Sequence, residues 1–337
     1  MQALVIAAPG QARIEDVPEP EMKPGEALLK VRRVGLCGSD LNSFRGRNPL
    51  VTFPRVPGHE IAATIVALSA DSSALTPGMD VTMSPYSHCG RCPACLNGRH
   101  NACQANQTLG VQRDGALTEY ITVPIEKLYA AHLNLQELGL VEPLTVGCHA
   151  AARGRVAAGE AVAVYGCGGV GLGAIAAAAA RGARVIAIDV DDAKLDLARA
   201  AGAAHTVNSR SQAVAAVLAQ WTDGAGPSVV IEAVGSAETF RAAVEQVAFT
   251  GRVVYIGYAK EPVAYETKLF VQKELDILGS RNALPEDFRA VVQLLEQHRF
   301  PVARVASTLV RLEQAPQVLQ DWSAHPERFS KITVSLD

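Results

Sequence analysis

Short apolar runs separated by glycine and proline fill the first 144 residues. Segments 27–31, 61–66 and 80–83 have the length and the β-branched content of strands. This pattern predicts a mostly β lobe with functional loops. The chain also opens on a strand-like run, 1–8, without a basic leader, so we expect no signal peptide.

The hydrophobic pattern changes near residue 145. Segment 161–165 is entirely apolar, 170–180 has the composition of a helix, and 183–189 is a second apolar run. The same rhythm predicts a helix over 194–200, a strand over 228–231, a helix from about 238, and strands over 252–256 and 275–278. Strands that alternate with helices are typical of a parallel sheet with crossover helices.

The rest of the chain returns to mixed helix and strand and ends in an apolar run at 331–334. We expect this tail to rejoin the first lobe. The predicted fold class is therefore α/β, with a doubly wound parallel sheet inserted into a mostly β domain. The predicted boundaries are 1–144, 145–282 for the nucleotide-binding domain, and 283–337 for the return.

Composition and charge exclude several classes of function. A length of 337 residues predicts about two domains, and 49% hydrophobic residues is ordinary for a soluble α/β protein. A net charge of −3 favours neither nucleic acid nor an anionic membrane as a partner. No apolar run reaches the roughly 20 residues of a membrane span. We expect a cytoplasmic enzyme with a small-molecule substrate, because the odd cysteine count of seven suits a reducing compartment.

A glycine-rich turn follows the apolar run 161–165. In a GxGxxG turn between strand and helix, the glycines allow a tight turn, close approach of pyrophosphate and helix–strand packing, while the helix N-terminus presents free N–H groups. The residues expected to bind a dinucleotide here are Gly166, Gly168, Gly169, Val170 and Gly171.

Asp189 ends the next predicted strand, where a carboxylate binds the adenosine ribose hydroxyls and repels a 2′-phosphate. This position favours NAD over NADP, although Asp189 could instead cap the helix that begins near Asp192. Lys194 could reach the same ribose or be an ordinary surface lysine.

Four cysteines with metal-type spacing lie within fifteen residues: Cys89, Cys92, Cys95 and Cys103. Four thiolates complete a tetrahedron around zinc and leave no open position, so such a zinc is structural. The alternative is a pair of disulfide-bridged loops, which cysteines this close form poorly.

A second set of metal-type residues comprises Cys37, His59, Glu60 and Glu142. One thiolate, one imidazole and one carboxylate make a three-ligand zinc site whose fourth position can hold water or substrate. The residue types alone are only suggestive, because a buried cysteine is often inert and a single histidine is often a core residue.

Together these motifs resemble the zinc-dependent medium-chain dehydrogenases. Segments 58–60, 114–120 and 142–144, the four-cysteine lobe and the glycine turn occur in that family's order. The resemblance covers nearly the whole chain and implies a Rossmann domain inserted into a GroES-like catalytic domain. Glu142-Pro143-Leu144 is similar to the polyol and threonine dehydrogenase branch, whereas the ethanol-type enzymes have a cysteine there.

The resemblance also implies roles for individual residues. Cys37, His59 and Glu60 become the zinc ligands, and Glu142 becomes either an alternate ligand or the carboxylate that holds the zinc-bound water. Ser39 occupies the place of the hydroxyl that takes the alcohol proton, and Asp40 would orient His59 or its loop. Many relatives have a histidine proton relay where this chain has Asn42, so the outer relay stays unassigned.

The substrate is less defined. Segments 278–288 and 110–115 are similar to bacterial L-galactonate 5-dehydrogenases, and an arginine can hold the carboxylate of a sugar acid. Arg113, Arg281 and Asn282 are therefore the candidate substrate residues, although either arginine could form an ordinary ion pair. We expect oxidation of a secondary hydroxyl of an aldonate.

Several alternatives remain open at this point. A sorbitol-type polyol and L-threonine are alternative substrates. A protein of a different class, which binds NAD on the same fold without catalysis, is a further alternative. Relatives imply a homotetramer or homodimer, with two zinc ions and NAD per chain.

Overall fold

The computed structural model describes residues 1–70, 72 and 74–337. The chain divides into two compact units, Met1–Glu142 together with Val302–Asp337, and Pro143–Pro301. The second unit extends to Pro301 and so includes a helix that the sequence pattern placed in the returning segment.

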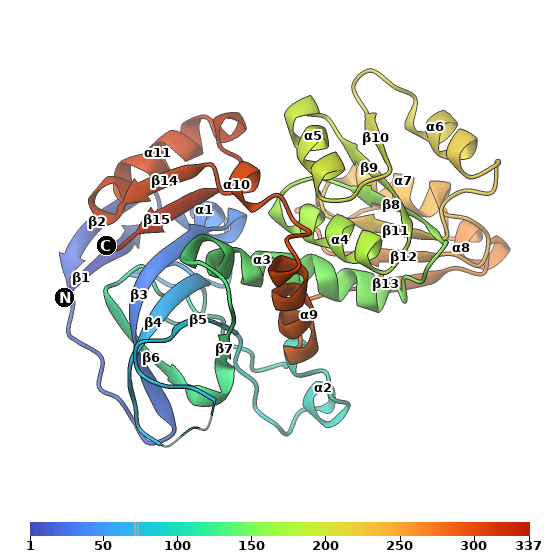
Figure 1. Ribbon diagram of the computed structural model, residues 1–337. Helices are drawn as coiled ribbons and strands as arrows, with labels where there is room; N and C mark the ends of the chain where they lie inside the picture. Colours follow the sequence, from blue (N-terminus) through green and yellow to red (C-terminus); the bar gives the residue numbers. More distant parts are fainter. Residues whose placement is uncertain (71, 73) are drawn as a thin grey trace. The chain divides into compact units, whose positions relative to one another are not determined.

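The first unit is built around a mostly antiparallel sheet. Within the described residues this sheet has seven strands in the order β14-β15-β3-β4-β5-β7, and β6 pairs with β3 (Figure 1). A separate two-stranded sheet pairs β1 (Gln2–Ala8) with β2 (Gln11–Asp16). The seven strands of the larger sheet are β3 (Glu26–Leu36), β4 (Glu60–Leu68), β5 (Asp80–Met83), β6 (Tyr120–Pro124), β7 (Leu128–Ala130), β14 (Thr308–Arg311) and β15 (Ile332–Ser335). The helices are α1 (Gly38–Phe44), α2 (Pro93–Leu96), η1 (His100–Ala102), η2 (Ile125–Lys127), α10 (Val302–Val305), η3 (Leu312–Gln314), α11 (Ala315–Ala324) and η4 (Pro326–Arg328).

Strand β3 is the centre of this unit. It is antiparallel to β4 on one edge and to β15 on the other, so a strand from the end of the chain lies beside one from its beginning. Alternate residues of β3 (Leu29, Val31) are fully buried and join a core that β1, β4 and α11 complete. Cys37, His59 and Glu60 lie where β3 ends and β4 begins.

The second unit is a parallel sheet covered by helices. Its described strands run in the order β10-β9-β8-β11-β12-β13, and all neighbouring pairs are parallel. This is the strand order of a dinucleotide-binding sheet, so the predicted α/β fold with a Rossmann domain inserted into a mostly β domain is confirmed. The strands are β8 (Ala161–Tyr165), β9 (Arg184–Asp189), β10 (His205–Asn208), β11 (Val229–Glu232), β12 (Arg252–Tyr255) and β13 (Asp276–Gly279). The helices are α4 (Gly169–Ala180), α5 (Asp192–Ala200), α6 (Val214–Trp221), α7 (Ala237–Gln246), α8 (Lys268–Gln272) and α9 (Pro285–Glu296).

Helix α3 (Leu135–Arg153) contains the division between the units, because Glu142 ends one and Pro143 begins the other. It packs backbone against backbone on α4. A Cβ on Gly147 would lie 2.2 Å from the Val170 carbonyl oxygen, so only glycine permits this approach.

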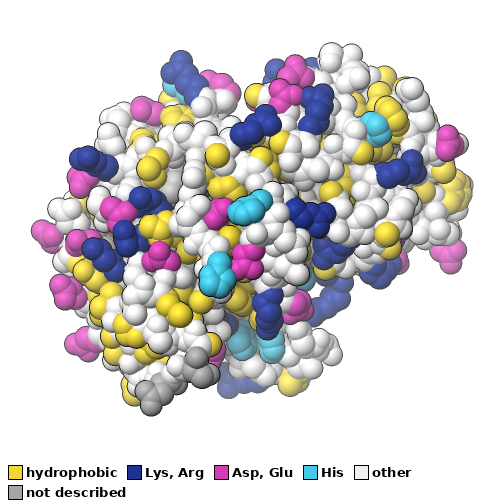
Figure 2. All heavy atoms as spheres, viewed as in Figure 1, with side chains coloured by type: hydrophobic (Ala, Val, Ile, Leu, Met, Phe, Trp, Pro, Cys, Tyr) yellow, Lys and Arg dark blue, Asp and Glu magenta, His cyan; other side chains and the backbone are white. Residues whose placement is uncertain are grey.

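Acidic and basic side chains are interspersed over the face drawn in Figure 2, in keeping with the small net charge. Among the described residues, we find no helix with the length and apolarity that a membrane crossing requires.

Candidate active site and cofactor site

The cluster of Cys37, His59 and Glu60 forms where two central strands meet. Cys37 follows β3 and is the N-cap residue of α1, His59 precedes β4, and Glu60 is the first residue of β4. One donor atom from each side chain lies within 4.8 Å of the others. His59 and Glu60 are buried, and Cys37 is partly exposed. The three donors can therefore share one ion.

Asp40 and Ser39, in the first turn of α1, hold the ring of His59. Asp40 Oδ1 lies 3.8 Å from His59 Nδ1, and Ser39 Oγ lies 3.4 Å from His59 Nε2. Asp40 is fully buried and accepts the backbone N–H of Cys37 at 2.8 Å, so it fixes the cysteine loop as well. Burial alone would lower the pKa of His59, but Asp40, Cys37 and Glu142 raise it well above its ordinary value.

Lys331 is a member of the site that the sequence did not indicate. Its ammonium group donates to Glu60 Oε2 and, at 3.2 Å, to the carbonyl oxygen of Leu36. Both side chains of the ion pair are buried, at 8% and 1% exposed. Burial lowers the pKa of Lys331, but the neighbouring Glu60 and Cys37 raise it more, so the lysine stays charged.

The sequence predicted a loop at Glu142, but the structure places this residue in helix α3. Its carboxyl group accepts a hydrogen bond from the hydroxyl of Tyr86, which is also buried. Burial raises the pKa of Glu142 to about 7, despite the opposing charge of His59. Glu142 lies outside the 4.8 Å group of three donors but is electrostatically coupled to it.

The chemistry of this donor set fits zinc. Thiolate, imidazole and carboxylate are the ligands that zinc takes in catalytic sites, with a fourth position open. The buried Nδ1 of His59 has no hydrogen-bond partner among the described residues, since Asp40 is slightly too distant. With zinc held by the other ring nitrogen, Asp40 would be the carboxylate that orients His59, as in carboxylate–histidine–zinc sites.

The four cysteines of the lobe around α2 also converge. Their sulfur atoms lie within 4.8 Å of one another, and Cys92 Sγ is 3.5 Å from Cys95 Sγ and 3.8 Å from Cys103 Sγ. A zinc tetrahedron with bonds of about 2.3 Å places sulfurs about 3.8 Å apart, whereas a disulfide bond is about 2.0 Å. Backbone N–H groups of Cys89 and Ala105 point at Cys103 Sγ, each at 3.3 Å, and would stabilise a thiolate there. This lobe can hold a structural zinc.

The glycine turn borders a cavity of about 650 Å³ in the second unit, at the carboxyl ends of the parallel strands. Gly166, Gly168, Asp189 and Lys194 line it. A Cβ on Gly171 would lie 1.8 Å from the Gly166 carbonyl oxygen, so this glycine lets α4 pack on the turn. Gly168 and Gly169 face open space, which leaves room for a pyrophosphate at the start of α4, beside Val170. The turn fits a dinucleotide.

Asp189 has a second role that its position in the sequence did not reveal. Its Oδ2 accepts the backbone N–H of Cys167 at 2.7 Å, and its Oδ1 accepts the N–H groups of Val190 and Asp191. The carboxylate thus ties the glycine turn to the end of β9. Helix α5 has a different cap, because Asp191 accepts the N–H of Ala193.

The candidate substrate residues lie in different units. Arg113 is half-buried in the first unit, and its Nε lacks a hydrogen-bond partner among the described residues. Burial lowers the pKa of Arg113, and the negative charge of Glu26 raises it by a smaller amount. Arg281 is exposed in the second unit, just after β13, and Asn282 adopts a left-handed backbone conformation with φ of 53°.

Besides Lys331, the sequence missed Tyr86 and the pair formed by His149 and Asp287. His149 Nδ1 lies 2.8 Å from Asp287 Oδ2, and this buried contact joins α3 to the start of α9. His149 stood out only as a histidine in the mostly apolar run 144–152, which does not identify its partner.

Two family models match the chain. The alcohol dehydrogenase GroES-like domain covers residues 23–132, and the zinc-binding dehydrogenase domain covers residues 169–297. The resemblance to zinc-dependent medium-chain dehydrogenases is therefore confirmed, together with the predicted zinc and NAD cofactors.

Individual relatives agree with this assignment. The chain is 35% identical over 297 residues to an L-galactonate-5-dehydrogenase of Escherichia coli K12, which covers 85% of this chain and 87% of that protein. It is 34% identical over 287 residues to a sorbitol dehydrogenase of Bacillus subtilis, which covers 83% and 81%.

Solved structures show the same architecture. A zinc-binding dehydrogenase of Sinorhizobium meliloti bound to NADP matches with a TM-score of 0.91 and 30% identity, over 99% of this chain and 98% of that one. The RspB protein of Escherichia coli in complex with NADH matches with a TM-score of 0.91 and 26% identity, over 100% and 99%. The chain belongs to the zinc-type medium-chain alcohol dehydrogenase family and is an NAD-dependent oxidoreductase acting on CH–OH groups.

Proposed function

We propose that this dehydrogenase oxidises a secondary hydroxyl group of a sugar acid, of the L-galactonate type, to a ketone. The observation that carries the proposal is the cluster of Cys37, His59 and Glu60, whose three donors leave a fourth position for a substrate oxygen. A zinc ion in this cluster supplies the Lewis acidity that makes a hydroxyl proton acidic at neutral pH.

The surrounding residues have separable tasks. Ser39 Oγ, 3.4 Å from the ring of His59, would accept the proton of a substrate hydroxyl that reaches the cluster while it passes its own proton to water. Glu142, held by Tyr86, offers an acceptor for a second hydroxyl of the substrate or for water. Bound NAD would supply the hydride acceptor, and the protein's part would be to align the carbinol carbon with it and to exclude water.

The names of relatives support a polyhydroxylated substrate. Besides the L-galactonate enzyme, they include a 2-dehydro-3-deoxy-L-galactonate 5-dehydrogenase of Pseudoalteromonas atlantica, at 29% identity, and the sorbitol dehydrogenase of Bacillus subtilis. A sorbitol-type polyol is the alternative substrate that these names favour.

A carboxylate separates the sugar acid from the polyol, and an arginine is the residue suited to bind it. Arg113 has a buried Nε without a partner among the described residues, and Arg281 follows the last strand of the nucleotide-binding sheet. We assign carboxylate binding to one of these two arginines.

The test measures reduction of NAD with L-galactonate, sorbitol and L-threonine, in wild type and in the variants Arg113→Ala and Arg281→Ala. Loss of a charge-assisted hydrogen bond, about 1.5–3 kcal/mol, should raise the KM for L-galactonate roughly tenfold to a hundredfold in one variant. The KM for sorbitol should change little. Arg210→Ala, an exposed arginine, is the matched control.

If the wild type oxidises sorbitol but not L-galactonate, the proposed substrate is a polyol and not a sugar acid. If an arginine variant loses activity equally on L-galactonate and sorbitol, that arginine does not bind the substrate carboxylate.

A further inference from the structure

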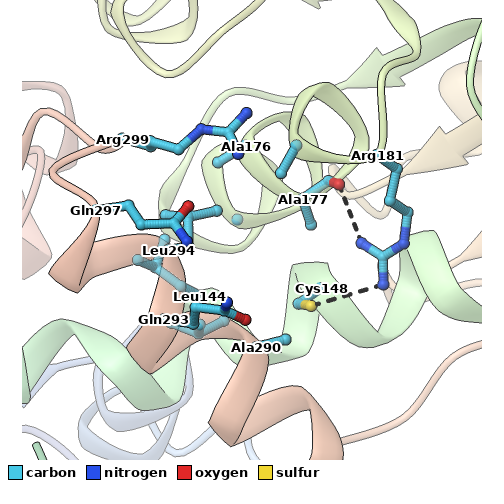
Figure 3. Close-up of a pocket in the computed structure, with 13 residues that line it drawn as sticks. Leu144, Cys148, Ala176, Ala177, Arg181, Ala290, Gln293, Leu294, Gln297 and Arg299 are labelled. Atoms are coloured by element: carbon cyan, nitrogen blue, oxygen red, sulfur yellow. Dashed lines mark hydrogen bonds between the residues drawn. The ribbon is translucent and has the colours of Figure 1, made fainter.

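A second cavity, of about 300 Å³, lies in the second unit between helices α3, α4 and α9 (Figure 3). It shares no lining residue with the cofactor cavity. The cofactor cavity is bordered by the glycine turn that precedes α4, whereas this cavity runs along α4 from Gly173 to the C-cap residue Arg181. Nothing in the dehydrogenase reaction requires it.

The cavity exists because α4 is made of small residues. α3 and α4 touch backbone to backbone at Gly173, where a Cβ would lie 2.6 Å from the Leu144 carbonyl oxygen. Further along, α4 presents only the methyl groups of Ala176, Ala177 and Ala180 to this space. Leu144, Val291 and Leu294 complete an apolar floor.

The charged side chains in the lining are both basic. Arg181 and Arg299 reach into the cavity from opposite sides in Figure 3, and the remaining polar side chains are the amides Gln293 and Gln297 and the thiol of Cys148. None of the thirteen lining residues is acidic. The lining therefore carries positive charge only; the carboxylate of Asp287, which acts on the Cys148 thiol from outside the lining, lies against His149.

Within the part of the chain that the structure describes, neither arginine forms an ion pair with an acidic side chain. Arg181 donates to the carbonyl oxygen of Ala177 at 3.0 Å and approaches Cys148 Sγ at 4.0 Å. Burial raises the pKa of the Cys148 thiol, so the sulfur stays neutral and does not balance the guanidinium. Over residues 1–70, 72 and 74–337, the ion pairs include neither Arg181 nor Arg299.

We propose that this cavity is a binding site for a small organic anion, a carboxylate with a short apolar body. The carboxylate would take hydrogen bonds from Arg181, Arg299 and the amides, in the geometry that a guanidinium fork favours. The apolar body would lie on the leucine, valine and alanine floor. The volume is at the lower end for small-molecule sites, which excludes a second dinucleotide.

The test uses hexanoate as the probe and the complete enzyme, loaded with zinc and NAD. Isothermal titration should show saturable binding of hexanoate, and binding roughly tenfold weaker, or about 1.4 kcal/mol, for the uncharged 1-hexanol. Hexylamine should not bind, because its charge has the wrong sign. Inorganic phosphate should bind more weakly than hexanoate, because it has no apolar body to contact the apolar floor. Equal or tighter binding of phosphate would overturn the proposed ligand class.

Three variants locate the site. Arg299→Gln removes one charge from an exposed side chain, and Ala290→Phe narrows the cavity from an exposed position of its lining, so neither should disturb folding. Each variant should weaken the binding of hexanoate at least roughly tenfold. Arg299→Gln removes one charged hydrogen bond, and Ala290→Phe removes the space for the apolar body. Arg289→Gln is the control, because Arg289 is an exposed residue of α9 and does not line the cavity.

Hexanoate can also reach the catalytic zinc, and the variants separate the two sites. Binding that survives both Arg299→Gln and Ala290→Phe lies elsewhere and overturns the proposal. Absence of saturable binding to the wild type also overturns it. Neither result bears on the sugar-acid proposal, which depends on turnover.

Discussion

Replacement of Lys331 by methionine tests whether the buried ion pair with Glu60 stabilises the site. Methionine keeps most of the volume of the lysine side chain but removes the ammonium group. Glu60 is then left 1% exposed without its cation, and the carbonyl oxygen of Leu36 loses a donor. Breaking one half of a buried ion pair costs about 3–5 kcal/mol, because the remaining charge is buried and uncompensated.

We therefore expect Lys331→Met to destabilise the first unit by about 3–5 kcal/mol in protein stripped of its metal. The loss should be smaller in zinc-loaded protein, because an ion bound at the cluster gives Glu60 another positive partner. The double variant Lys331→Met/Glu60→Gln should recover part of the loss, since it buries no unpaired charge.

The two tryptophans make the assay specific to one unit. Trp322 lies on α11 of the first unit and Trp221 on α6 of the second. In a Trp221→Phe background, tryptophan fluorescence during urea unfolding reports the first unit alone. Lys30→Met, an exposed lysine on β3, is the control and should change the free energy of unfolding by less than about 0.5 kcal/mol. If Lys331→Met proves as mild as this control, or if the double variant is only the sum of its parts, the ion pair does not stabilise the site.

Two further changes test the metal and cofactor sites. Gly171→Ala places a Cβ 1.8 Å from the Gly166 carbonyl oxygen, so we expect NAD binding, followed by fluorescence titration, to be lost. Gly139→Ala in α3 meets no atom within 4 Å and should bind NAD like the wild type; equal binding by both variants would refute the packing role. Cys103→Ser removes a fully buried sulfur of the four-cysteine cluster, so elemental analysis should find one zinc per chain instead of two. Cys148→Ser should keep both ions, and a full zinc content in Cys103→Ser would contradict the structural zinc.

Features whose members are close in the sequence could be predicted. The glycine turn and the four cysteines each occupy one short segment, so spacing alone restricts where their atoms can lie. The strands of the second unit were also predictable, because a buried parallel strand is apolar on both faces. β10 is the exception: it contains His205, Thr206 and Asn208, and at the edge of the sheet it has no need of apolar residues on both faces.

Helix α3 shows how a local rule can mislead. Pro143 lies inside it, and proline normally indicates the end of a helix. The helix nevertheless continues to Arg153, and beyond the proline Gly147 packs closely on α4. The single helix thus carries Glu142 beside the metal cluster and Leu144 in the lining of the second cavity. The sequence placed both residues in one motif, 142–144, but did not indicate that this motif lies inside a helix.

The ion pair of Lys331 and Glu60 could not have been predicted from either residue, since 271 positions separate them. It depends on strand register. Glu60 on β4 lies opposite Gly35 of β3, and Lys331 immediately precedes Ile332, which lies opposite Leu36 from the other edge of β3. The two side chains therefore meet across β3, over the residue that has no side chain. A Cβ on Gly35 would lie 2.0 Å from Glu60 Oε2 and 3.1 Å from Lys331 Cε. Gly35, two positions before Cys37, is thus the space in which the end of the chain reaches the metal cluster.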